Sequence, residues 1–112
     1  MEITHKRIEP DVTVLTPVGR LSLGRETQAF DAAVADALAK GERKVVLDLG
    51  DVAYVDSAGL GVILSAASRL KQAGGQMRLA NVGSRVMQVL KMTRTDSILA
   101  IDPDVSAAAG KF

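Results

Sequence analysis

The sequence predicts an α/β fold, in which a mixed β-sheet joins an N-terminal antiparallel hairpin to parallel βαβ units and carries its helices mainly on one face. Two segments with alternating apolar residues come first, at 1–9 and 12–18, and predict the hairpin. From residue 12 onward, strand and helix patterns alternate, which is typical of parallel strands joined by helical crossovers. Each helix pattern has a single apolar stripe, as expected of helices that cover one face of a sheet.

The first half of the chain contains the hairpin, one helix and a buried strand. The hairpin turn falls at residues 9–11, and Pro17 indicates that part of the second strand lies near an edge or at a strand end. Residues 24–41 have apolar side chains at helical spacing and end in a glycine, so we expect an amphipathic helix. The β-branched residues of 44–55 predict a strand, a turn at 50–51 and a short continuation.

The second half of the chain repeats the alternation of helix and strand. In order, we expect a helix from 57 to the glycines at 74–75, a strand at 76–80, a helix at 84–93 and a strand at 97–101. Ser84 is the expected N-cap of its helix. Asp102 followed by Pro103 predicts the start of a final short helix.

Composition limits the classes of function. The chain has 112 residues, a net charge of +1 from scattered charges, and no cysteine. We therefore expect a single domain over residues 1–112, no nucleic-acid partner, and neither a metal nor another cofactor. The first ten residues lack the apolar core of a signal peptide, and no apolar run reaches the ~20 residues of a membrane span, so we expect a cytoplasmic protein without a membrane partner.

The segment Asp56-Ser57-Ala58-Gly59-Leu60-Gly61 is unusual for the start of a helix. Its ordinary interpretation is that Asp56 or Ser57 is an N-cap. The two glycines nevertheless cost about 0.5 to 1 kcal/mol each relative to alanine. Missing β-carbons let another backbone, a phosphate or a partner protein approach, and a helix N-terminus favours an anion. The segment thus predicts either close protein contact or a phosphate site.

Other chemistries fit these residues less well. The dinucleotide fingerprint would need a small residue at Leu64, and no NTPase phosphate loop is present. A hydrolase would need a base for Ser57, and the single histidine, His5, is expected to be an exposed strand residue. Asp48, Asp51 and Asp56 could form a metal or phospho-aspartate site, but their spacing is more typical of turn residues.

The chain resembles the STAS domain family, in its stand-alone form as an anti-sigma factor antagonist. The resemblance rests on "VTVLTPVGRLS", "KVVLDLGDVAYVDSAGLGVIL", "GGQMRLANV" and "VMQVLKMTRTDSILAI", which together cover nearly the whole chain. It implies a mixed sheet with helices mainly on one face. It also implies that Ser57, directly after the aspartate of "DSAGLG", is the phosphorylated residue.

The resemblance further implies a partner-switching cycle. The unphosphorylated protein binds an anti-sigma factor that is also a serine kinase and holds ATP, which frees the sigma factor. Phosphorylation of Ser57 ends the interaction, and a PP2C-type phosphatase resets it. The implied partner-binding residues are Ser22, Asp56, Ser57, Ala58, Gly59, Leu60 and Gly61.

Two positions depart from the family pattern. Ala58 stands where relatives often have Ser or Thr, and Ser22 stands where many phosphorylated relatives have aspartate. A scaffold that is not phosphorylated, or a nucleotide-binding regulatory module, is the alternative function that these departures leave open.

Overall fold

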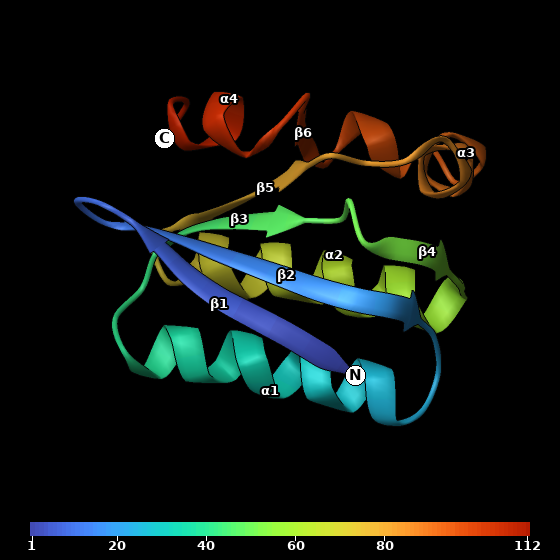
Figure 1. The fold of residues 1–112 in the computed structure, drawn as a ribbon, viewed down its shortest axis with the longest axis horizontal. Coiled ribbons are helices and arrows are strands. Elements are labelled where there is room, and N and C mark those ends of the chain that lie inside the picture. Colours follow the sequence, from blue (N-terminus) through green and yellow to red (C-terminus); the bar gives the residue numbers. More distant parts are fainter.

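A six-stranded mixed sheet forms the centre of the computed structural model, which describes residues 1–112 (Figure 1). The strands are β1 (Glu2–Ile8), β2 (Val12–Leu21), β3 (Lys44–Asp48), β4 (Val52–Val55), β5 (Gln76–Ala80) and β6 (Ala100–Asp102). Their order is β1-β2-β3-β5-β6, with β4 paired to the far end of β2. β1 and β2 are antiparallel, and all other pairs are parallel. The predicted hairpin and parallel units are confirmed.

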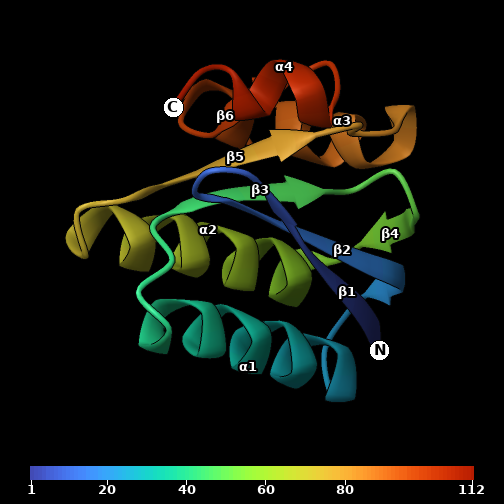
Figure 2. The same cartoon turned by 60° about the vertical axis from the view of Figure 1, so that its left-hand side comes forward.

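Four helices cover this sheet: α1 (Arg25–Ala39), α2 (Ser57–Gln72), α3 (Ser84–Met92) and α4 (Val105–Ala109). α1 and α2 lie side by side against one face, and the short α4 lies on the other face over β3, β5 and β6 (Figure 2). α3 lies at the carboxyl end of the sheet, beside β4. None of the helices has both the length and the apolar character needed to cross a membrane.

The two faces of the sheet have separate cores. Leu15, Val45 and Leu47 belong to the larger core under α1 and α2, whereas Val14 and Val46 belong to the smaller one under α4. Successive residues of a strand point to opposite faces. β3 is therefore buried on both sides, which explains its unbroken run of apolar residues.

Pro17 lies at a point where β2 has a neighbouring strand on one side only, which agrees with the expectation that this part of the strand lies near an edge. Residues 12–15 of β2 pair with β3 and residues 19–21 pair with β4, while Pro17 is paired only with Ile3 of β1. The missing N–H of proline therefore falls where β2 has no parallel neighbour, so no parallel ladder hydrogen bond is lost.

Two boundaries in the second half differ from the prediction. Gly83, not Ser84, is the N-cap of α3, and it provides no side-chain cap. Instead of a strand from 97, residues 95–97 form a 3₁₀ turn and β6 begins only at Ala100. The buried hydroxyl of Thr95 donates to the carbonyl of Leu90, and this bond folds the chain back onto the end of α3.

Asp102 is also not the N-cap that the sequence predicts. It ends β6 with a fully buried side chain, and Asp104 caps α4 by accepting from the Ala107 N–H. The Asp102 carboxylate accepts hydrogen bonds from Arg78 Nε at 2.6 Å and Nη2 at 3.3 Å, and it lies 2.9 Å from Lys111 Nζ. Asp102 therefore joins β5, β6 and the C-terminal residues. The hydrogen bonds from Arg78 hold its pKa below the ordinary value, although burial acts in the opposite direction.

Asp102→Asn should destabilise the fold by about 3 kcal/mol, because it leaves Arg78 without a counter-charge in a site with little solvent. A carboxyl group whose pKa falls on folding stabilises fully above its unfolded pKa, and this stabilisation is lost as the pH falls through its folded pKa. The urea midpoint of the wild type should therefore fall between about pH 5 and pH 2, and that of the variant should fall less. Asp36→Asn, which removes the exposed partner of Lys40, is the control. Equal acid sensitivity of wild type and Asp102→Asn would contradict the stabilising role assigned to the Asp102 carboxylate.

Candidate functional site

The segment 56–61 lies at the carboxyl end of β4, where the chain enters α2. Val55 is paired with Leu21 at the end of β2, and the Asp56 N–H donates to the Leu21 carbonyl at 3.3 Å. Ser22, the next residue after β2, therefore lies beside the start of α2, as the predicted site requires. Ser57 is exposed, and Ser22 is half-buried.

Asp56 performs the capping that the ordinary interpretation assigned to either Asp56 or Ser57. Its Oδ1 accepts from the Gly59 N–H at 2.7 Å, and its Oδ2 accepts from the Leu23 N–H at 3.1 Å. These two N–H groups lower the pKa of Asp56, so it is ionised at neutral pH. Ser57 is the first residue of α2. Because Asp56 caps the helix, the Ser57 hydroxyl is left free at the surface.

The two glycines of the segment have different roles. Gly59 is buried, and a β-carbon there would overlap the carbonyl oxygen of Leu21. Gly61 is exposed, and a β-carbon there would meet nothing within 4 Å. The sequence predicted that another backbone could approach one of these glycines. The backbone that does so is β2 of the same chain, and it approaches Gly59. Only Gly61 leaves a bare patch on the surface.

The structure places the expected partner-binding residues in two groups. Asp56, Ser57, Ala58 and Gly61 reach the surface of the helix start, and the half-buried Ser22 lies beside them. Gly59 is buried, and Leu60 is only 7% exposed and belongs to the main core. The side chain of Leu60 is therefore not available to a partner in this fold, and both Gly59 and Leu60 serve to hold α2 on the sheet.

Sequence reasoning missed three neighbours of this segment. Leu23, whose backbone is held by Asp56, is 78% exposed. Arg20 of β2 and Arg85 of α3 both place their guanidinium groups over the ring of Tyr54, with Cζ at 5.3 Å and 5.6 Å from the ring centroid. The one sequence signal available was Leu23, an apolar residue outside any expected core. Arg20 meets Tyr54 through the strand register, and Arg85 meets it through the placement of α3.

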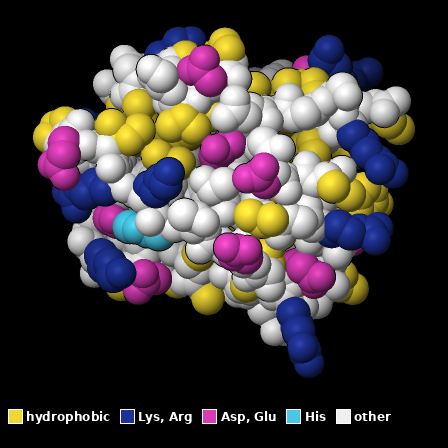
Figure 3. Space-filling model, viewed as in Figure 1, with side chains coloured by type: hydrophobic (Ala, Val, Ile, Leu, Met, Phe, Trp, Pro, Cys, Tyr) yellow, Lys and Arg dark blue, Asp and Glu magenta, His cyan; other side chains and the backbone are white.

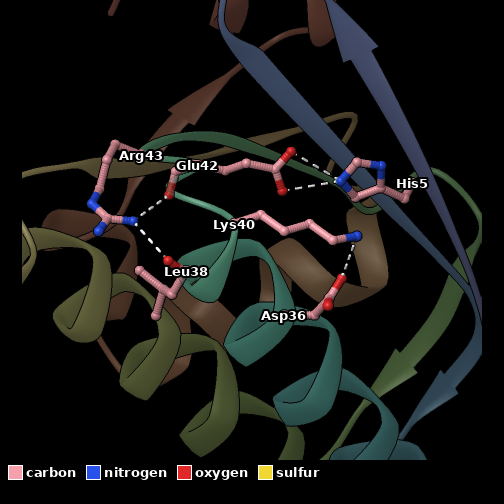
Figure 4. Close-up of polar contacts among 6 residues, drawn as sticks. All are labelled: His5, Asp36, Leu38, Lys40, Glu42 and Arg43. Carbon is pink, nitrogen blue, oxygen red and sulfur yellow. Dashed lines mark hydrogen bonds and ion pairs between the residues drawn. The ribbon is translucent and has the colours of Figure 1, made fainter.

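His5 lies far from Ser57, which excludes the pairing that a hydrolase would need. His5 Nε2 lies 3.1 Å from Oε1 of Glu42, near the C-terminal end of α1 (Figure 4). His5 is paired with Leu15, six residues along β2 from Leu21, a span of about 20 Å. Burial raises the pKa of Glu42, but hydrogen bonds from His5 and Thr13 outweigh it and hold that pKa below its ordinary value.

The acidic residues considered for a metal or phospho-aspartate site are not clustered. Asp48 Oδ1 accepts from the Gly50 N–H at 3.0 Å and from Asn81 Nδ2 at 3.1 Å, as a turn residue does. Asp56 is committed to its two backbone bonds. No group of three histidine, cysteine, aspartate or glutamate side chains in the structure is arranged to hold a metal ion.

Comparison with known proteins identifies the family. The family model described as "STAS domain" matches residues 4–108. The chain belongs to the STAS domain family. This assignment agrees with the fold and with the position of the "DSAGLG" segment at the start of α2.

Several relatives of this STAS domain carry names that describe a function. The chain is 38% identical over 85 residues to the "Putative anti-sigma factor antagonist BtrV" of Bordetella bronchiseptica, which covers 76% of this chain and 73% of that protein. The crystal structure of a "putative anti-sigma factor antagonist" from Thermotoga maritima matches with a TM-score of 0.89 and 32% identity, over 97% of this chain and 92% of that one. The anti-sigma factor antagonist SpoIIAA in its unphosphorylated form matches with a TM-score of 0.73 at 16% identity, over 96% of this chain and 94% of that one, and shows the fold alone.

The contrast between the glycines of this STAS domain can be tested by two alanine substitutions. Gly59→Ala should destabilise the fold by about 2 kcal/mol or more, because α2 must move away from β2. Gly61→Ala should stabilise it by about 0.5 to 1 kcal/mol, because alanine favours the helix. Urea unfolding of both variants measures the difference. Equal stability of the two variants would show that the contact with Leu21 does not constrain Gly59.

Proposed function

We propose that this STAS domain is an anti-sigma factor antagonist controlled by phosphorylation of Ser57. The unphosphorylated form binds an anti-sigma factor that is also a serine kinase, and this binding frees the sigma factor. The kinase, with its own ATP, then phosphorylates Ser57 and ends the interaction, and a PP2C-type phosphatase restores the hydroxyl. In this cycle the domain is a regulator and substrate, not an enzyme.

The observation that carries the proposal is the free, exposed hydroxyl of Ser57 on a helix that Asp56 already caps. A hydroxyl that the fold does not use can be modified without unfolding the protein. The names of the relatives support an antagonist role. SpoIIAA, whose fold this chain shares, has also been solved in a phosphorylated form, so in that protein the fold and the modification are compatible.

A phosphate on Ser57 would act mainly on the partner interface. It adds about −1.5 to −2 charges beside the ionised Asp56. Within the domain, the positive end of the α2 dipole offsets part of this charge. A partner surface that fits a hydroxyl group and the bare Gly61 would clash with the larger phosphate and be repelled by its negative charge. A loss of about 1.4 to 4 kcal/mol is enough to weaken binding ten- to a thousand-fold.

Intact mass spectrometry after incubation with ATP tests the modification. We expect one added phosphate at Ser57, only when the anti-sigma factor kinase is present, and none in Ser57→Ala. In titrations with the kinase, Ser57→Ala should bind but resist release by ATP, and Ser57→Asp should bind at least tenfold more weakly, because a carboxylate mimics part of the phosphate charge.

Ser65→Ala, at an exposed position about two turns further along α2, is the matched control and should behave as the wild type. Equal affinity of wild type and Ser57→Asp would contradict the switch. Protection against melting by ATP alone, with no added mass, would indicate the nucleotide-binding module instead.

Gly61→Leu tests whether the bare patch contacts the partner. The added side chain meets open space in the free domain, so the melting transition should stay cooperative. It should weaken kinase binding at least tenfold, because it keeps a partner from approaching the first turns of α2. Gln72→Leu, at the far end of the same helix, should bind as the wild type does. Unchanged binding of Gly61→Leu would remove this turn from the interface.

A further inference from the structure

Two arginines and one tyrosine form a cluster at the carboxyl end of the sheet. Arg20 and Tyr54 are cross-strand neighbours in the register of β2 with β4. Arg85 reaches the same ring from the first turn of α3. The guanidinium carbons lie 5.3 Å and 5.6 Å from the ring centroid, within the range of a cation–π contact. We name these three residues the Arg–Tyr–Arg cluster.

Neither arginine of the cluster has an anionic partner. The ion pairs of the chain involve His5, Lys40, Lys44, Arg69, Arg78 and Lys111. Arg20 and Arg85 are exposed, and the structure gives their side chains no hydrogen bond. Both guanidinium groups are thus ordered by one aromatic ring, while their N–H donors remain available. Such planar donor groups match carboxylates in two-point contacts.

The cluster adjoins the proposed phosphorylation site. Tyr54 precedes Ser57 by three residues, so their α-carbons are at most about 10 Å apart. Arg20 precedes Ser22 by two residues, and the exposed Leu23 follows. Figure 3 shows basic and hydrophobic side chains together along the edge where β4 and α3 lie in Figure 1. Tyrosine and arginine are enriched among the residues that contribute most to protein interfaces.

We propose that the Arg–Tyr–Arg cluster is the docking site for an acidic segment of the protein that binds beside Ser57. The inference rests on the proposed function for the identity of that protein, an anti-sigma factor kinase. Two unpaired cations near one ring repel each other, and carboxylates bound to the guanidinium groups relieve that repulsion. The position next to Ser57 lets one partner contact the cluster, Leu23 and the start of α2 together.

Octaglutamate tests the acid-binding surface without the kinase. Tyr54 is the only tyrosine and the chain has no tryptophan, so tyrosine fluorescence reports directly on the cluster. We expect a saturable change on titration at low salt, and at least fivefold weaker binding by the double variant Arg20→Ala/Arg85→Ala, measured by calorimetry. Lys6→Ala/Lys91→Ala removes the same charge from exposed positions and should bind within twofold of the wild type. Absence of binding by the wild type, or equal losses in the two double variants, would overturn the inference.

A titration with the anti-sigma factor kinase tests the partner. Arg20→Glu/Arg85→Glu should bind at least tenfold more weakly, with Lys6→Glu/Lys91→Glu within twofold of the wild type. Unchanged affinity of Arg20→Glu/Arg85→Glu, with Ser57 still phosphorylated, would overturn this inference alone. If no anti-sigma factor kinase phosphorylates Ser57, while octaglutamate still binds the wild type more tightly than Arg20→Ala/Arg85→Ala, the proposed function would be overturned. The acid-binding surface would remain.

Discussion

The start of α2 depends on one close contact, between Gly59 and the carbonyl oxygen of Leu21 at the end of β2. Only a residue without a β-carbon allows the helix to lie this close to the strand. The contact places Leu60 in the main core and sets the position of every exposed group on the first turn. The cost of a glycine in the helix is thus offset by burial of the residues around it.

Asp56 is hydrogen-bonded to both residues of this contact, because its N–H donates to the Leu21 carbonyl and its carboxylate accepts from the Gly59 N–H. These bonds determine what Ser57 can do. One carboxylate oxygen caps α2 and the other holds the Leu23 backbone, so β2, β4 and α2 meet at one ionised side chain. Ser57 is released from any structural task. With the single histidine at the other end of the sheet, a free serine at this position suits a reversible modification better than nucleophilic catalysis.

Every buried polar side chain of the fold has a hydrogen-bond partner, whereas the two exposed arginines beside Ser57 have none. The buried Asp102 is matched by Arg78 and Lys111, and His5 is matched by Glu42. Arg20 and Arg85 instead both contact the ring of Tyr54 and keep their donors free. A domain with a net charge of only +1 thereby presents a local basic surface next to its proposed switch.

The sequence by itself determined the order of strands and helices along the chain and the helix start that carries the candidate site, because both depend on local patterns. Alternating and helical spacing predicted the hairpin and the parallel units, and "DSAGLG" identified the helix start with Ser57. Local patterns were less reliable where a distant contact competed with them. Asp102, for example, is held in β6 by Arg78 rather than serving as a cap. Only the tertiary structure distinguished the role of Gly59 from that of Gly61. The Leu21 carbonyl, which leaves no room for a β-carbon at Gly59, lies 38 residues earlier in the sequence. It alone also brought Arg20 and Arg85 to Tyr54, because strand register and helix placement are set by packing of the whole sheet.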